Sequence, residues 1–431
     1  NISENTFTYT QDANTPEILL TIKDASGNEI KSITGLTHKT VTDGKGASIS
    51  GFDITTKSEI ITLFDNREIT TTSSKTEEWN ITVTFVNYDA DQSKNAGKSF
   101  DAKLMIQQEN LGNQTLAEYV ISQYTGTQGE NSIYYHNSTL ANGAGDNSYR
   151  YAGANPNNFV CFGSDTSPCP TDNLYRIIGV FGENYHGVTG KQLVKLIKYD
   201  YMTTDELGTD GDYSQTYKEW GMGSTYKGTY GDGERIGVYY WNYKATGSAT
   251  NTWSTSLLNK TNLNTNFINY LGTTWANKIA TVTWKVGGNT WANIGTKTSS
   301  VAYTNEITNP VTTNTTDNAT TYSAKIGLMY VSDYGYSVQK NYWGEILFNY
   351  NGISIDGPLR LLNWMYMGAT EWTISPDTTA TYDVFAIYYD GRIINQTVDD
   401  LTYNFRPVFF LNSSVSYVSG TGTQSDPIRI N

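Results

Sequence analysis

Apolar and polar side chains alternate along the amino-terminal quarter of the chain. In TFTYT, Phe7 and Tyr9 share one side and the threonines share the other, and EEWNITVTFVNYD repeats the pattern with Trp79, Ile81, Val83 and Phe85. Alternation with a period of two residues is typical of a strand with one buried and one solvated face. Gly, Asn and Asp separate these runs, as turns do. Residues 1–110 are therefore predicted to form an antiparallel β-sandwich without a helix.

The pattern changes after the polar segment QQENLGNQ (107–114), where we place a domain boundary. In the stretch that follows, Thr115 and Glu118 have the spacing of a helix capping box, and a helical stripe is formed by Leu116, Tyr119, Val120 and Tyr124. A short helix is therefore predicted to open a second domain, residues 115–431.

The second domain mixes strand-like runs with long loops. Strands are predicted for NLYRIIGVFG, KQLVKLIKYD, IATVTWKVGG, EWTIS, DVFAIYYDGRI and FRPVFFL, and one or two short helices for WSTSLLNKTNLNTNFINYL. AKIGLMYVSDYGYS is interpreted as a strand and a turn, and the Thr- and Asn-rich residues 295–321 as a loop. The predicted fold class is mainly β, with an α+β second domain.

Composition and charge narrow the class of protein. Of 431 residues, 38% are hydrophobic and only 16% are charged, and 33 are tyrosines, which favours polar-faced strands over disorder. The net charge is −13 and the cations are scattered, so nucleic acid is not an expected partner. No apolar run reaches the roughly 18 residues of a membrane span. The opening NISENTFTYT resembles a mature amino terminus, so an extracellular location is expected.

The two cysteines, Cys161 and Cys169, lie in the Gly/Ser/Pro-rich loop VCFGSDTSPCP. In an exported protein this spacing favours a disulfide; free thiols in a cytosolic protein are the alternative. Two sulfurs without a nearby histidine cannot complete a tetrahedral metal site. No metal and no cofactor are therefore expected.

Several stretches of the second domain, taken in order, resemble the C-type lectin-like fold. LYRIIGVF with LVKLIK is similar to its first hairpin, NTWSTSLLNKTNLNTNFI to its helical insert, AKIGLMYVSDYGYS to its inner strand, and NWMYMGATEWTIS, AIYYDGRI and NFRPVFFL to its closing sheet. The resemblance covers roughly residues 115–431. It points to the bacterial branch that includes formylglycine-generating-enzyme-like and variable proteins, and it implies a display or binding domain.

The first domain resembles the camelysin and biofilm-fibre sandwiches of Gram-positive bacteria. The stretch EEWNITVTFVNYDADQSKNAGKSFDAKLMIQ carries this resemblance. Some sandwiches of this kind polymerise by donating an amino-terminal strand to a neighbour. Together the two resemblances imply an exported surface protein of a Firmicute.

The sequence favours a protein without enzymatic activity. There are 3 histidines, none beside a recognisable nucleophile, and no G-x-S-x-G elbow. The formylglycine-generating relatives oxidise their substrates through cysteines, but Cys161 and Cys169 lie in an early loop, outside the corresponding part of the domain. An enzyme on that fold remains the least favoured alternative.

The acidic run DADQS has the opening spacing of an EF-type calcium loop at Asp89, Asp91 and Ser93. The central Gly and the closing Glu are replaced by Lys94 and Phe100. A solvated turn is therefore favoured over a calcium site.

A ligand face is expected just before the last strand, where the resemblance places the face of the variable proteins. Tyr and Trp supply rigid contact area, and Asn supplies adaptable hydrogen bonds. The candidate residues are Trp372, Tyr382, Tyr388, Tyr389, Arg392, Asn395 and Tyr403. The alternative is an ordinary strand with tyrosines on its solvent-exposed face and no role in binding.

The amino-terminal segment, with Ile2, Phe7 and Tyr9, is either the first strand of its own domain or a strand donated to the next copy. The leading hypothesis is a non-enzymatic surface adhesin or filament subunit that self-associates into a homopolymer and displays a lectin-like domain. The alternative is a monomeric surface lectin for a glycan or a host protein.

Arg406 and Pro407 stand at the entrance of the last predicted strand. Proline suits a first strand position because it has no N–H to donate. Arg406 is expected to be structural, bound to loop carbonyls or to a carboxylate such as Asp399 or Asp400.

Overall fold

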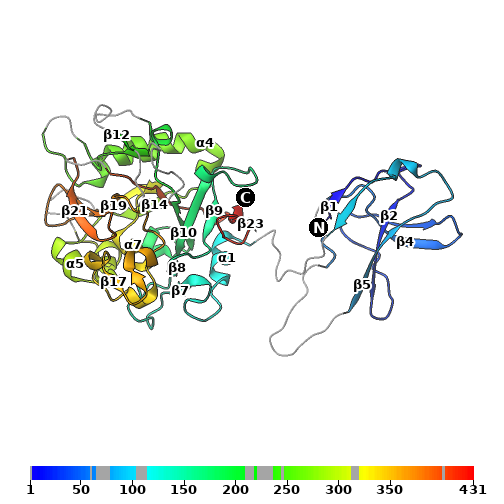
Figure 1. Ribbon diagram of the computed structural model, residues 1–431, viewed down its shortest axis with the longest axis horizontal. Helices are drawn as coiled ribbons and strands as arrows, with labels where there is room; N and C mark the ends of the chain where they lie inside the picture. Colours follow the sequence, from blue (N-terminus) through cyan, green and yellow to red (C-terminus); the bar gives the residue numbers. More distant parts are fainter. Residues whose placement is uncertain are drawn as a thin grey trace. The chain divides into compact units, whose positions relative to one another are not determined.

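The computed structural model describes residues 2–58, 61–64, 78–102, 114–208, 218–220, 236–243, 247–311, 320–399 and 403–431. In these ranges the chain is mainly β, with several antiparallel sheets. It divides into two compact units, Asn1–Asn110 and Leu111–Asn431, called unit 1 and unit 2 (Figure 1). No helix in the described ranges has the length and apolarity to cross a membrane.

Unit 1 contains a four-stranded antiparallel sheet of order β3-β4-β2-β5 and a separate pair, β1-β6. The strands are β1 Ile2–Asn5, β2 Ile18–Asp24, β3 His38–Thr42, β4 Ser48–Asp53, β5 Trp79–Phe85 and β6 Phe100–Ala102. Ile18, Leu20 and Ile22 alternate along β2 and pack with Phe52 and Ile54 in the core of this unit. The continuation of the stretch SFDAKLMIQ beyond Ala102 lies outside the described residues.

Strand β5 buries its predicted apolar face only in part. Trp79 and Ile81 are partly buried, whereas Val83 is 36% and Phe85 53% exposed. The Phe85 ring contacts those of Phe7 and Phe100, at 5.4 Å and 5.9 Å between centroids. The alternation therefore predicted the strand correctly, but it did not predict how much of this face is covered.

A seven-stranded antiparallel sheet forms the centre of unit 2, in the order β16-β22-β11-β10-β8-β7, with β9 also paired to β10. Its strands are β7 Ile133–Tyr135, β8 Tyr149–Tyr151, β9 Phe159–Cys161, β10 Leu174–Phe181, β11 Leu193–Lys198, β16 Ile326–Gly327 and β22 Val408–Phe410. Every residue of β10 and β11 is buried, as expected for near-continuous apolar strands covered on both faces.

Smaller antiparallel sheets surround the central one. A three-stranded sheet contains β19 Glu371–Pro376, β20 Asp383–Ile387 and β21 Ile393–Thr397. The two-stranded sheets are β12 Lys218–Trp220 with β13 Ile236–Val238, β14 Val282–Lys285 with β15 Thr321–Ala324, β17 Ile353–Ser354 with β18 Gly357–Pro358, and β23 Tyr417–Ser419 with β24 Arg429–Ile430. The predicted strands of this unit are therefore confirmed. The structure adds further short strands that the sequence analysis did not predict, among them β7, β8, β9 and β21.

The helices of unit 2 are short. They are α1 Leu116–Ser122, α2 Glu183–His186, α3 Thr204–Leu207, α4 Ile268–Ala276, α5 Trp291–Thr296, α6 Ser299–Tyr303 and α7 Val331–Ser337. The capping box of α1 is confirmed: Thr115 Oγ1 accepts from the Glu118 N–H, and a Glu118 carboxylate oxygen accepts from the Thr115 N–H. The helices predicted around residues 253–271 are confirmed by the π-helical segment Leu258–Phe267 and by α4.

The alternating stretch TFTYT (residues 6–10) does not form the predicted strand, because β1 ends at Asn5. Two further local predictions, both in unit 2, were wrong. Residues 295–321 are not only a loop, because α6 and a following π-helical turn lie within them. The turn predicted after β16 is the helix α7, whose residues are all buried. In both places burial against the rest of the unit outweighs the weak helix propensity of Ser, Thr, Tyr and Gly.

Arg406 is structural and binds a backbone carbonyl and a carboxylate, as predicted, but the carboxylate is that of Glu371 and not one of the two named from the sequence. The Arg406 Nε and Nη2 atoms donate to the two carboxylate oxygens of Glu371 at 2.8 and 2.9 Å, and Nη2 also donates to the Met365 carbonyl at 2.7 Å. Both side chains of the pair are buried. Asp399 instead accepts from the Ala249 N–H, and Asp400 lies outside the described residues.

Candidate functional site

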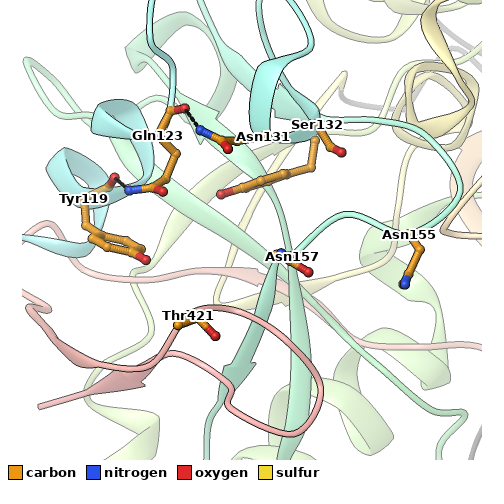
Figure 2. A pocket seen from close by; sticks show the side chains of 8 residues that line it. Tyr119, Gln123, Asn131, Ser132, Asn155, Asn157 and Thr421 are labelled. Atoms are coloured by element: carbon orange, nitrogen blue, oxygen red, sulfur yellow. Dashed lines mark hydrogen bonds between the residues drawn. The ribbon is translucent and has the colours of Figure 1, made fainter.

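A pocket of about 150 Å³ opens on the surface of unit 2, where α1 lies near β9 and β23 (Figures 1 and 2). Segments that are far apart in the chain build it: helix α1, the loops at 129–132 and 155–158, and the turn after β23. The lining residues are Tyr119, Gln123, Asn131, Ser132, Tyr151, Asn155, Asn157 and Thr421.

One wall of the pocket is helix α1. Tyr119 stacks on Tyr417 with 3.8 Å between ring centroids and 11° between planes, which joins the helix to β23. Burial, followed by the neighbouring Tyr417, raises the pKa of Tyr119, so its hydroxyl stays protonated at neutral pH. Gln123 ends the helix and donates to the Tyr119 carbonyl at 3.3 Å.

The second wall has an unusual backbone. Asn131 and Ser132 both have left-handed φ angles, 56° and 59°, and Gly129, two residues before Asn131, has a φ of 86°. Left-handed φ is uncommon for a residue with a side chain and is found most often in turns and at functional sites. The Asn131 amide donates to the Gln123 carbonyl at 2.9 Å and ties this loop to α1 (Figure 2).

The floor is the loop 155–158, held from beneath by a buried cation. The guanidinium of Arg176 donates to the Pro156 carbonyl at 3.0 Å and to the Asn158 side chain at 2.8 Å. It lies between the rings of Phe159 and Trp364, at 4.4 and 4.6 Å from their centroids. Burial lowers the pKa of Arg176 to about 9, so it stays charged at neutral pH.

The pocket offers hydrogen-bonding groups that the protein itself does not use. The side chains of Ser132, Tyr151, Asn155 and Asn157 form no hydrogen bond within the described part of the chain. Together they present two amides and two hydroxyls. The lining contains no carboxylate, histidine, lysine or cysteine. Such a site is suited to holding a neutral, hydroxyl-rich group rather than to acid–base chemistry.

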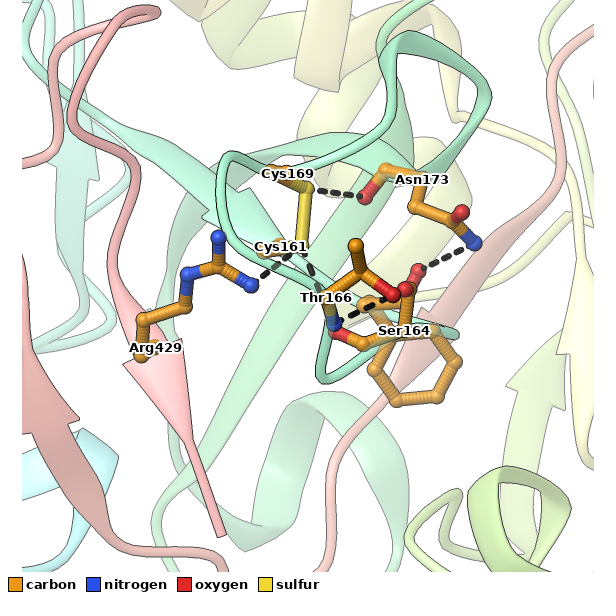
Figure 3. The surroundings of a disulfide bond; sticks show 7 residues. Cys161, Ser164, Thr166, Cys169, Asn173 and Arg429 are labelled. Atoms are coloured by element: carbon orange, nitrogen blue, oxygen red, sulfur yellow. Dashed lines mark hydrogen bonds between the residues drawn. A yellow bond between two sulfur atoms is a disulfide. The ribbon is translucent and has the colours of Figure 1, made fainter.

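The disulfide Cys161–Cys169 is present and closes a loop next to this site (Figure 3). Cys161 ends β9, the strand that leaves the floor loop, and its sulfur accepts from Arg429 on β24 at 3.2 Å. The Asn173 side chain donates to the Phe162 carbonyl at 3.1 Å and closes the other side of the loop. The disulfide therefore fixes the strand that positions Asn155 and Asn157.

The predicted tyrosine-rich face does not form one site. Trp372 is fully buried and donates its indole N–H to the Tyr239 carbonyl at 2.8 Å, so it cannot contact a ligand. Tyr403 packs on Trp372 and donates to Gln396 at 3.0 Å. Asn395, the neighbour of Gln396 on β21, donates to Asp377 at 3.1 Å. Adjacent strand residues face opposite sides, so Asn395 and Tyr403 belong to opposite faces.

The remaining predicted residues lie at the two ends of β20. Tyr382 precedes the strand and is 49% exposed. Tyr388 and Tyr389 follow it in the turn to β21, with 4.3 Å between their ring centroids. The Arg392 guanidinium lies 5.2 Å from the Tyr388 ring, so the structure brings together Tyr388, Tyr389 and Arg392 only. This group, in which Tyr389 is exposed and Tyr388 and Arg392 are half-buried, is called the aromatic turn.

The acidic run at residues 89–93 forms a turn in which Asp91 accepts from the Ser93 N–H at 2.9 Å. Within the described ranges, no group of three or more His, Cys, Asp and Glu side chains is placed as a metal ion would require.

The amino-terminal segment is bound within unit 1. Ile2 is buried, β1 pairs with β6, and the Asn5 amide donates to the carbonyls of Ile54, Thr55 and Lys57. Tyr9 donates to Asp53 at 3.0 Å. Of the two alternatives for this segment, the structure has the strand paired in its own chain.

Sequence reasoning missed the pocket. Its loops belong to the Gly- and Asn-rich region after residue 126, which gave no periodic pattern. The available signal was the cluster NPNN at 155–158, an Asn/Pro run typical of an ordered turn.

No protein-family model matches this chain, and no curated protein or solved structure matches it.

Proposed function

We propose that the chain is a non-enzymatic, extracellular protein of a bacterial cell surface that binds carbohydrate through the pocket of unit 2. In this proposal unit 2 is a C-type lectin-like display domain and unit 1 is a β-sandwich that carries it. The main support is the set of pocket side chains that form no hydrogen bond within the described residues: Ser132, Tyr151, Asn155 and Asn157.

The size and chemistry of the pocket favour one sugar ring. Its volume of about 150 Å³ is well below the roughly 300–1,000 Å³ of pockets that enclose drug-sized ligands. Amides and hydroxyls match the donors and acceptors of sugar hydroxyls. The net charge of −13 disfavours an acidic sugar, so a neutral hexose or N-acetylhexosamine at the end of a glycan is proposed.

Replacing Asn157 with leucine is expected to weaken glycan binding at least about tenfold, because one or two hydrogen bonds are lost and an apolar group faces the sugar hydroxyls. Binding to immobilised neutral glycans, followed by titration with the best one, measures the effect. Asn341→Leu is the matched control, since Asn341 is exposed and lies outside the pocket. Equal binding by the parent and by Asn157→Leu would contradict the pocket as the site.

The aromatic turn is the alternative binding surface, for a glycan or a protein ligand. Tyr389 is 53% exposed and Arg392 stands beside Tyr388, a combination common in protein-binding loops. Should the Tyr388→Ala/Tyr389→Ala double variant lose glycan binding while Asn157→Leu keeps it, the turn and not the pocket is the sugar site.

A second candidate function is self-association into a homopolymer through unit 1. Strand β1 pairs with the three residues of β6 in a sheet of its own, apart from the four-stranded sheet. A neighbouring copy could supply the same pairing by strand exchange.

Deleting residues 2–9 is expected to abolish assembly if strands are exchanged. Size-exclusion chromatography and negative-stain microscopy of the full chain should then show oligomers that the deletion removes. The deletion also removes the Asn5 contacts, so the variant Asn5→Ala, which keeps the strand, serves as a control. A full-length protein that is monomeric at high concentration would refute strand exchange.

A further inference from the structure

A lysine and an aspartate meet in the interior of unit 2. Lys195 belongs to β11 of the central sheet, and Asp333 belongs to α7. The Lys195 Nζ lies 2.5 Å from Asp333 Oδ2, and both side chains are 0% exposed. The residues are 138 positions apart in the sequence, so this contact joins two distant parts of the fold.

The surroundings of the pair are aromatic. The Lys195 Nζ lies 4.4 Å from the ring centroid of Tyr330 and 4.8 Å from that of Tyr185. The rings of Phe181, Trp284 and Phe410 lie within 5.7 Å of the same atom. Two opposite charges in such a place have lost their hydration, and only good geometry compensates for that loss.

Burial also favours the neutral form of the amine. It lowers the pKa of Lys195 to about 8, despite the nearby Asp333 carboxylate. Transfer of one proton from the ammonium to the carboxylate gives a neutral amine and a carboxylic acid in direct contact. A desolvated neutral amine is a nucleophile, as in lysines that attack carbonyl groups.

Two donors polarise the carboxyl group. The Tyr185 hydroxyl donates to Asp333 Oδ1 at 2.8 Å, and the Tyr330 N–H donates to Oδ2 at 2.9 Å. Lys195 Nζ donates to the Tyr185 oxygen at 2.9 Å. The side chains of Lys195, Tyr185 and Asp333 are therefore all hydrogen-bonded to one another. Fixed donors of this kind stabilise the negative charge that develops on oxygen when an amine adds to a carboxyl carbon.

We propose that Lys195 and Asp333 are joined by an intramolecular amide bond in the mature protein. The neutral Lys195 Nζ attacks Cγ of the protonated Asp333. The Nζ–Cγ bond forms, the Cγ–Oδ2 bond breaks, and Oδ2 leaves as water with the carboxyl proton and one amine proton. Oδ1 remains as the amide carbonyl oxygen, bonded to the Tyr185 hydroxyl. No oxidant and no second reactant are needed.

Strand β11 contributes the lysine of a second buried ion pair, which serves as a comparison for the first. Lys198 forms an ion pair with Glu206 at 3.1 Å, with side chains 1% and 5% exposed. The other Glu206 oxygen accepts from the N–H and hydroxyl of Thr203, and no ring centroid lies near the Lys198 Nζ in the described part of the chain. This pair is expected to remain ionic.

The mass of the full-length protein tests the proposal without any variant. After reduction and denaturation, the protein is expected to be lighter than its calculated mass by one water molecule. Trypsin should fail to cleave after Lys195, and tandem mass spectrometry should find the peptides of Lys195 and Asp333 linked. Cleavage after Lys198 should be normal. A denatured protein with its full calculated mass and cleavage after Lys195 would overturn the proposal.

The variant Lys195→Arg assigns the bond to this pair. Its expected mass is the full calculated value, and this holds whether or not the variant folds, because the cross-link can no longer form. If the variant still lacks one water, the mass loss arises elsewhere and the assignment to Lys195 and Asp333 is wrong.

Discussion

Replacing Arg406 with methionine is expected to lower the free energy of unfolding by about 3–5 kcal/mol, because Glu371 then remains as a buried charge without a partner. The loss also frees the Met365 carbonyl, which accepts from Arg406 at 2.7 Å. Urea unfolding followed by tryptophan fluorescence measures the change, since most tryptophans lie in unit 2.

Two variants separate the buried charge from other causes. Arg392→Met is the matched control: Arg392 is 32% exposed beside Asp390, and the expected change is below about 1 kcal/mol. In the double variant Arg406→Met/Glu371→Leu no charge is left unpaired, and much of the stability should return. An Arg406→Met protein as stable as the parent would show that the pair does not anchor β22.

Stability is also expected to depend on the protonation of Glu306. This side chain is 0% exposed; it accepts from the N–H groups of Val331 and Ser332 and from the Ser375 hydroxyl. Burial raises its pKa from 4.5 to about 7, an effect that these hydrogen bonds reduce. Between these two pH values the folded protein holds a proton that the unfolded chain has released, so the free energy of unfolding falls as the pH rises.

The size of this effect follows from the shift in the pKa of Glu306. One pKa unit corresponds to about 1.4 kcal/mol, so raising the pH from 4.5 to 8 should cost roughly 3 kcal/mol through this group. Glutamine at position 306 does not titrate. Between pH 4.5 and 8 the parent should therefore lose roughly 3 kcal/mol of unfolding free energy relative to Glu306→Gln. A difference that is constant with pH would contradict a buried, neutral Glu306.

The β-strands were the most predictable part of the fold. Alternation identified β5, and continuous apolar runs identified β10 and β11, because the side-chain period and the burial of a strand are directly visible in the sequence. The capping box at Thr115 identified α1. Helix α7 was missed, because VSDYGYS has weak helix propensity and its helix depends on burial by distant segments.

Contacts between residues far apart in the sequence were harder to predict than helices and strands. Arg406 was expected to bind a carboxylate close in sequence, but Glu371 reaches it because β19 lies beside the entry to β22. The pocket was missed for the same reason: Tyr119, Asn157 and Thr421 come from segments that only the tertiary fold brings together. Local residue patterns do not show which distant segments the tertiary fold brings into contact.

The tyrosine-rich stretch shows the opposite error. Its residues are close in sequence, which suggested one face, but a β-hairpin sends alternate residues to opposite sides and places its ends apart. Trp372 and Tyr403 support the sheet from within, and only the aromatic turn remains on the surface as a group.

Hydrogen exchange of the full-length protein, with and without a saturating neutral glycan, tests the proposed carbohydrate site most directly. Exchange is expected to slow in the presence of the glycan in residues 129–132, 155–158 and 421–423, which contain pocket residues, and to stay unchanged in the aromatic turn at 388–392. Protection confined to the aromatic turn, or a saturating glycan that protects no part of unit 2, would contradict it.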